Sequence, residues 1–276
     1  MDDSSYPEAM VTVRTQYRPR AARRLIGLAL GCLLMLAAVP APAGAASKPY
    51  ALDLGTRSDF VAQTNIVQCV GASMQMMLNM IEPGADRTAA TQLKLQKLAR
   101  EWSGQRQDGS ERKGASVRGW SAGLNQMGGG PYKVVGKATL EEALMSAARA
   151  MRTTGRPVGL LVWRGRHAWV MSGFKATGDP LIRGSRVTAA IVEDPLYPHS
   201  SGIWGRSPAP GATLSVEALG RQFVPRRLSS SQFGGMYVLV LPYEYELRTV
   251  RMRSLRLTNA DRSAQAPWSP SALDPN

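Results

Sequence analysis

The chain has 276 residues, of which 44% are hydrophobic, and it carries a formal net charge of +14. This hydrophobic fraction allows a full core, and the surplus of arginine could attract an anionic polymer or an acidic lipid surface. The arginines are scattered rather than gathered in a dense basic run with interleaved aromatic residues, so the composition argues against nucleic-acid binding.

The N-terminal segment, residues 1–46, has the layout of a secretory signal with a long basic lead. Five arginines precede an uncharged apolar run over residues 25–39, two prolines follow, and a small-x-small pattern ends at Ala45. We expect cleavage after Ala45 or Ala46, and therefore a secreted or extracytoplasmic protein. The alternative is an uncleaved membrane anchor over residues 25–46, because this stretch approaches the roughly 20 residues that cross a bilayer.

The next residues, 47–59, are predicted to be an extended lead-in to a folded domain over residues 60–243. The first half of this domain should be helical, since apolar residues recur at helical spacing over residues 69–80, 87–102 and 117–127. A fourth helix is expected after Thr139, because Thr139 and Glu142 match a capping box, and Gly155 should end it.

The second half of the domain should form a sheet. Runs rich in β-forming residues are separated by glycines and short polar loops, and they cover residues 158–163, 167–174, 187–193 and 236–241. Residues 178–184 are predicted to be a hairpin tip, 197–210 a loop, and 215–222 one more short helix. Helices followed by strands predict an α+β fold with a mostly antiparallel sheet. Residues 244–276 are predicted to be a charged, largely disordered tail.

Only one cysteine lies outside the predicted signal. Cys32 falls within the apolar run, which would leave Cys69 as an unpaired thiol in an oxidising compartment. Such a thiol is a liability unless it is buried and inert or performs chemistry. Cys69 is at the predicted start of a helix, and the partial positive charge of a helix N-terminus favours the reactive thiolate.

Three other side chains could complete a nucleophilic site around Cys69. His167 could take up the thiol proton and later protonate the leaving group. Asp194, at the end of a predicted strand, could hold the imidazole in the productive tautomer. Gln63 could donate its amide to the developing oxyanion, together with the backbone N–H of Cys69.

Each of these assignments has an alternative. His199 is the only other histidine in the chain and would be the rival base, and Gln68 lies near Gln63. Asp194 precedes a proline and could simply form a turn. The chain contains neither a GxGxxG nor a P-loop pattern, and it has too few histidines and cysteines for a structural zinc site. We therefore expect neither a cofactor nor a metal.

The order Gln63, Cys69, His167, Asp194 resembles the papain-like superfamily of cysteine peptidases. Within it, the chain is most similar to the C39-like peptidase group of bacteria, over residues 60–243. The matching stretches are Cys69-x-Gly71-Ala72-Ser73-x-x-Met76, Gly155-Arg156-Pro157-Val158, Gly165-Arg166-His167-Ala168-Trp169-Val170 with Gly173-Phe174, and Val192-Glu193-Asp194-Pro195-Leu196. The resemblance implies a helical half that carries Cys69 and a sheet half that carries His167 and Asp194, with the site between them.

The resemblance also implies a function. It points to a secreted cysteine hydrolase that cleaves an amide or ester bond of a peptide or acyl substrate. Two alternatives stay open: a transglutaminase-like acyltransferase with the same triad, and a non-catalytic module that binds an anionic cell-envelope polymer. Membrane contact is expected only if residues 25–46 are retained.

The long interval between His167 and Asp194 predicts an extended hairpin.

Overall fold

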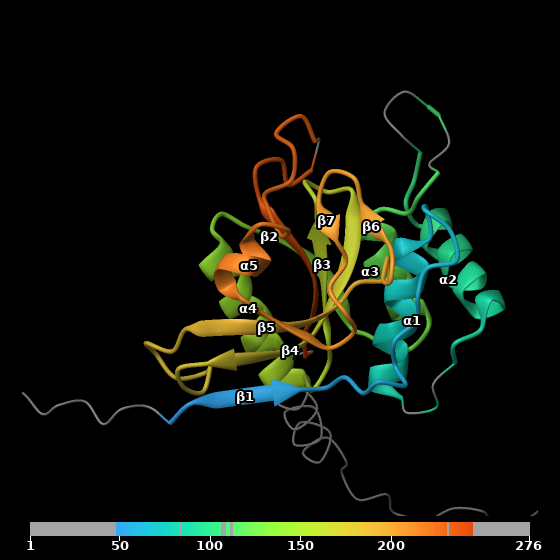
Figure 1. Ribbon diagram of the computed structural model, residues 1–276. Helices are drawn as coiled ribbons and strands as arrows, with labels where there is room; N and C mark the ends of the chain where they lie inside the picture. The colour runs from blue at the N-terminus through green and yellow to red at the C-terminus, as the bar shows by residue number, and fades with distance from the viewer. Residues whose placement is uncertain are drawn as a thin grey trace, which may run out of the picture. The chain divides into compact units, whose positions relative to one another are not determined.

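The computed structural model describes residues 48–244, apart from 83, 85, 106–108, 111–112 and 231 (Figure 1). The predicted signal segment and nearly all of the predicted tail lie outside the described residues. Within the described part of the chain, no helix has both the length and the apolar character that crossing a membrane requires.

A seven-stranded sheet forms the centre of the fold, and all of its pairings are antiparallel. Its order is β2-β9-β3-β4-β5-β8, and β1 also pairs with β4. The strands are β1 (Tyr50–Asp53), β2 (Tyr132–Lys137), β3 (Val158–Val162), β4 (His167–Ala176), β5 (Val187–Glu193), β8 (Ala212–Ser215) and β9 (Tyr237–Pro242). Two short strands, β6 (Ser200–Ser201) and β7 (Gly205–Arg206), form a separate hairpin.

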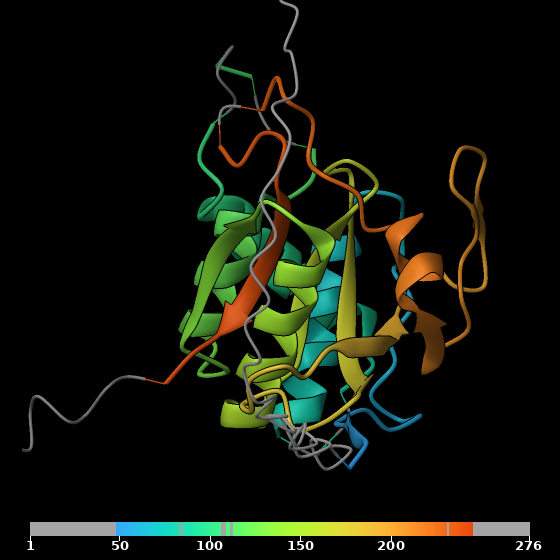
Figure 2. The same ribbon diagram turned by 90° about the vertical axis from the view of Figure 1, so that its left-hand side faces the viewer.

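Helices cover both faces of the sheet. In Figure 1, α1, α2 and α3 lie to the right of the sheet, and α4 and the short α5 lie to the left. The view in Figure 2, turned by 90°, shows α4 lying across the sheet. The helices are α1 (Cys69–Ile81), α2 (Ala89–Glu101), α3 (Val117–Gln126), α4 (Leu140–Thr154) and α5 (Val216–Gly220).

The alternation of side chains along β4 explains this layered arrangement. Ala168 and Val170 belong to the core shared with α1, α2 and α3, whereas Trp169 and Met171 belong to the core shared with α4. Successive side chains of a strand point to opposite faces of a sheet, so a strand buried on both faces is apolar almost throughout.

The predicted α+β fold with an antiparallel sheet is confirmed. The predicted capping box is present, with the Glu142 N–H donating to Thr139 Oγ1 at 3.1 Å, and Gly155 ends α4 in the left-handed conformation with φ of 64°. The five predicted helices, including the short one expected at 215–222, and the four predicted strands all form, with bounds shifted by a few residues. The expected hairpin around residues 178–184 joins β4 and β5.

Several short strands fall where the sequence predicted none. The lead-in, residues 47–59, contains β1, so this segment contributes to the sheet rather than preceding the domain. The predicted loop at 197–210 contains β6 and β7. Such short strands carry little periodic signal: β1 forms because the long strand β4 supplies its hydrogen-bond partners, whereas β6 and β7 pair with each other.

Candidate active site

Cys69 is the first residue of α1, where the helix dipole is positive, and its side chain is half-buried. Two buried glutamines of α2 hold this end of α1. Gln96 Oε1 accepts the Gly71 N–H at 2.9 Å, and Gln96 Nε2 donates to the Val67 carbonyl at 2.9 Å. Gln92 binds the preceding loop by accepting the Thr64 N–H at 2.8 Å. Cys69 therefore lies at a helix end that hydrogen bonds from α2 hold in place.

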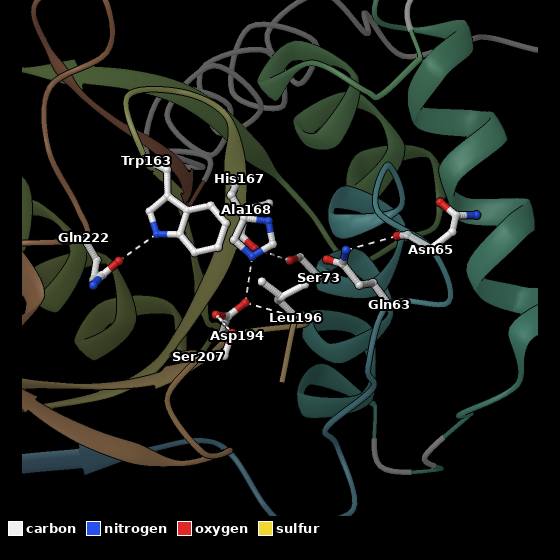
Figure 3. Close-up of polar contacts among 10 residues, drawn as sticks. All are labelled: Gln63, Asn65, Ser73, Trp163, His167, Ala168, Asp194, Leu196, Ser207 and Gln222. Atoms are coloured by element: carbon white, nitrogen blue, oxygen red, sulfur yellow. Dashed lines mark hydrogen bonds and ion pairs between the residues drawn. The ribbon is translucent and has the colours of Figure 1, made fainter. Parts of the chain in front are cut away.

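His167 and Asp194 meet because of the antiparallel pairing of their strands. His167 is the first residue of β4, and Asp194 directly follows the last residue of β5. Since Val170 pairs with Glu193, the start of β4 lies beside the end of β5. Ser73, one turn after Cys69, donates to the Ala168 carbonyl at 3.3 Å, which joins α1 to the same end of β4 (Figure 3).

The His167 imidazole is held by a buried carboxylate. His167 Nε2 lies 2.7 Å from Asp194 Oδ1, and both side chains are buried. The Leu196 N–H also donates to Oδ1 at 2.9 Å, and the Ser207 hydroxyl donates to Oδ2 (Figure 3). Because Nε2 faces the carboxylate, Nδ1 is the ring nitrogen left to serve Cys69.

Cys69 and His167 lie close enough for each to shift the pKa of the other. Burial raises the pKa of the Cys69 thiol, but the hydrogen bond and the charge of His167 outweigh it, so the pKa is lowered. Burial lowers the pKa of His167, but the bonds to Asp194 and Cys69 outweigh it and raise the pKa to about 9. Both shifts favour a thiolate–imidazolium pair.

Gln63 lies on the loop before α1, and its backbone N–H donates to the Pro195 carbonyl at 2.7 Å. Its Nε2 donates to the Asn65 carbonyl at 3.0 Å, and its Oε1 is buried without a partner among the described residues (Figure 3). An amide nitrogen carries two hydrogens, so one can still be donated to a bound substrate. The predicted oxyanion role of Gln63 thus stays a prediction.

The alternative residues lie elsewhere. His199 is exposed on the loop after Asp194, whose carboxylate bonds to His167. The Gln68 side chain is buried and accepts the Thr64 hydroxyl. The structure therefore brings together Cys69, His167 and Asp194, with Gln63 on the adjoining loop.

Sequence reasoning missed Trp163, whose ring stacks on the His167 imidazole with centroids 4.2 Å apart and an interplanar angle of 20° (Figure 3). Trp163 and Arg164 both have φ of 56°, an uncommon conformation for residues other than glycine. Gln222 holds Trp163 there, since its carbonyl accepts the Trp163 N–H at 3.0 Å and its Oε1 accepts the indole N–H at 2.7 Å. The sequence offered one indication that Trp163 lies near the site, namely its position four residues before His167.

Comparison with known proteins finds neither a family model nor a curated protein that matches this chain. In the described part of the chain, no group of three or more His, Cys, Asp or Glu side chains is placed to hold a metal ion.

Proposed function

We propose that this chain is a secreted cysteine hydrolase of the papain-like type, similar to the C39-like peptidases. Its substrate would be the amide or ester bond of a peptide or acyl compound. The observation that carries the proposal is the grouping of Cys69, His167 and Asp194: His167 is hydrogen-bonded to the fully buried Asp194 carboxylate, and it lowers the pKa of the Cys69 thiol. A nucleophile, a base and an orienting group in hydrogen-bond contact are what acyl transfer through a thiol requires.

The proposed reaction has two stages. The Cys69 thiolate attacks the carbonyl carbon, and the resulting oxyanion accepts hydrogen bonds from the Cys69 N–H and a Gln63 amide hydrogen. The C–N or C–O bond then breaks, and the His167 imidazolium gives its proton to the leaving group, which leaves an acyl–Cys69 thioester. In the second stage, water loses a proton to His167 and attacks the thioester, which releases the acid and restores the Cys69 thiolate beside the His167 imidazolium.

The placement of the three groups also supports the papain-like assignment. Cys69 begins a helix, whereas His167 and Asp194 lie at the ends of two adjacent inner strands of an antiparallel sheet packed against that helix. The same division into a helical and a sheet half was expected from the resemblance. Export from the cytoplasm stays part of the proposal, and it rests on the sequence of residues 25–46.

The test is product analysis with a mixed peptide library at pH 5–9, with and without added glycinamide as an acceptor amine. Mass spectrometry should detect new peptide carboxylates with wild-type protein, and none with Cys69→Ala or His167→Ala. The matched control, His199→Ala, removes the exposed histidine and should leave the products unchanged. Products joined to glycinamide would indicate an acyltransferase, and no products from the wild type would contradict the proposal.

A further inference from the structure

A cavity of about 250 Å³ lies next to His167, because its lining includes Trp163, whose ring stacks on the His167 imidazole. It is lined by Trp163, Arg164, Arg166, Ile203, Trp204 and Arg227. Three segments form it: the turn between β3 and β4, which carries Trp163 to Arg166, the tip of the β6–β7 hairpin, which carries Ile203 and Trp204, and the loop between α5 and β9, which carries Arg227. Arg166 directly precedes His167, so this cavity lies beside the group that must protonate the leaving group.

The cavity has a strong surplus of positive charge. Arg164, Arg166 and Arg227 are exposed, and none of them is ion-paired with a carboxylate among residues 48–244 that the structure describes. The lining contains no acidic residue. Three guanidinium groups around one small cavity attract an anion and present planar pairs of N–H donors that match a carboxylate.

The cavity also has an exposed apolar wall. Ile203 is 78% exposed at the tip of the β6–β7 hairpin, which projects from the body of the domain in Figure 2 as an orange loop. The Trp204 ring is parallel to that of Trp163, with an interplanar angle of 4° and centroids 6.3 Å apart. Neighbouring apolar and cationic groups fit a peptide segment better than a purely ionic polymer.

The wall is fixed before any ligand binds. Gln222 Nε2 donates to the Trp204 carbonyl at 3.1 Å, while its Oε1 accepts the Trp163 indole N–H. The Ser201 hydroxyl accepts the Trp204 N–H at 3.1 Å inside the hairpin. Gln222 thus connects two of the three segments that form the cavity, and a preorganised wall loses less freedom when a ligand binds.

We propose that this cavity binds the leaving-group side of the substrate and selects peptides that carry an acidic side chain there. This inference rests on the proposed function, because His167 identifies the leaving-group side only if Cys69 is the nucleophile. The arginines bind the carboxylate, and Ile203 and Trp204 contact the neighbouring apolar side chain.

The first test is binding, which needs no catalysis. Fluorescein-labelled peptides of alternating leucine with glutamate, glutamine or lysine are titrated into the full-length Cys69→Ala protein, with fluorescence anisotropy as the readout. The glutamate peptide should bind about tenfold more tightly than the glutamine peptide, and the lysine peptide most weakly. The double variant Arg166→Gln/Arg227→Gln should bind the three peptides with similar affinity. The double variant Arg166→Glu/Arg227→Glu should bind the lysine peptide most tightly and the glutamate peptide most weakly.

The matched control removes two positive charges elsewhere. The double variant Lys94→Gln/Lys97→Gln removes the same amount of charge from α2, whose residues do not line the cavity. It should leave the order of the three peptide affinities unchanged. Equal loss of binding in this control would show general attraction of anionic polymers and overturn the proposal. So would equal affinity of the unsubstituted Cys69→Ala protein for the three peptides.

The second test is the position of acidic residues among the products of the peptide library. The C-terminal fragments, which are released as leaving groups with a new N-terminus, should be enriched in aspartate and glutamate near the cleavage point, and the arginine variants should lose this enrichment. Acidic residues on the acyl side instead would overturn the inference while leaving hydrolysis intact. Charge-dependent binding without any cleavage would overturn the proposed function itself.

Discussion

Asp194 accepts hydrogen bonds from His167, Leu196 and Ser207 in the interior of the domain. Each of these donors stabilises the ionised carboxylate, which offsets the cost of burying it. The fixed carboxylate in turn fixes the imidazole and raises its pKa. Asp194 therefore affects the reactivity of Cys69 indirectly, through His167.

Replacing Asp194 with alanine should lower the pKa of His167 from about 9, because a principal cause of the upward shift is removed and burial remains. We expect kcat/KM to fall by about 100-fold to 10,000-fold. The pKa can be followed by NMR of the histidine ring protons, since the chain contains only two histidines. An unchanged His167 titration would contradict this role of Asp194.

At the scale of elements, the close approach of α1 to α2 positions Cys69. Gly71 lies two residues after Cys69, and a Cβ there would lie 2.8 Å from the Gln92 carbonyl oxygen and 2.9 Å from Gln96 Cβ. Both distances are too short for a methyl group, and one of them involves backbone. Only glycine lets α1 approach α2 closely enough for Gln96 to bind its first turn.

Gly71→Ala should therefore force the start of α1 away from α2. We expect a loss of about 1–3 kcal/mol in the free energy of unfolding, measured by urea denaturation, together with slower Cys69 alkylation. Gly84→Ala is the matched control, because the nearest heavy atom to a Cβ there is 3.9 Å away. Equal effects of the two substitutions would show that the contact between α1 and α2 does not position Cys69.

Elements with local signals could be predicted from the sequence, and elements that depend on distant partners could not. The capping box at Thr139 and the apolar spacing after Cys69 are local, and both helices form where expected. The strand β1 forms because β4 offers a free edge at residues 173–176, which no local pattern reveals.

The same distinction applies to the site. Cys69, His167 and Asp194 could be selected because few residue types perform this chemistry and each had a recognisable setting. Ser207 and Gln222 could not, because a serine in a loop and a glutamine after a short helix have no distinguishing pattern. Their contacts with Asp194 and Trp163 arise only from the folding of the β6–β7 hairpin and α5 against the sheet.

At the scale of the whole molecule, a buried acid makes stability depend on pH. Glu193 lines a cavity of about 770 Å³ together with Asp53, Arg57 and Arg87. Burial raises the pKa of Glu193 to about 7, and the negative charges of Asp53 and Asp59 add to this, against hydrogen bonds from Gly211 and Ser172. The folded state therefore binds this proton more tightly than the unfolded state does.

The consequence for stability has a definite sign. The stability that the raised pKa of Glu193 contributes to the folded state is fully present below the ordinary pKa of 4.5, and it is lost as the pH rises through about 7. Glutamine does not ionise, so Glu193→Gln should remove this loss. Between pH 4.5 and pH 8, the free energy of unfolding of the variant should rise by up to about 3 kcal/mol relative to that of the wild type. Urea denaturation at several pH values measures the difference, and a constant difference across this range would contradict the prediction.

The central claim is that His167 activates Cys69, and the most direct measurement is the rate of Cys69 alkylation by iodoacetamide from pH 4 to 9. Peptide mapping identifies the labelled cysteine, and His199→Ala serves as the matched control for His167→Ala. The account predicts rapid alkylation well below the free-thiol pKa of about 8.5 in the wild type and in His199→Ala, and its loss in His167→Ala. A slow reaction that follows an ordinary thiol titration and is unchanged in His167→Ala would contradict it.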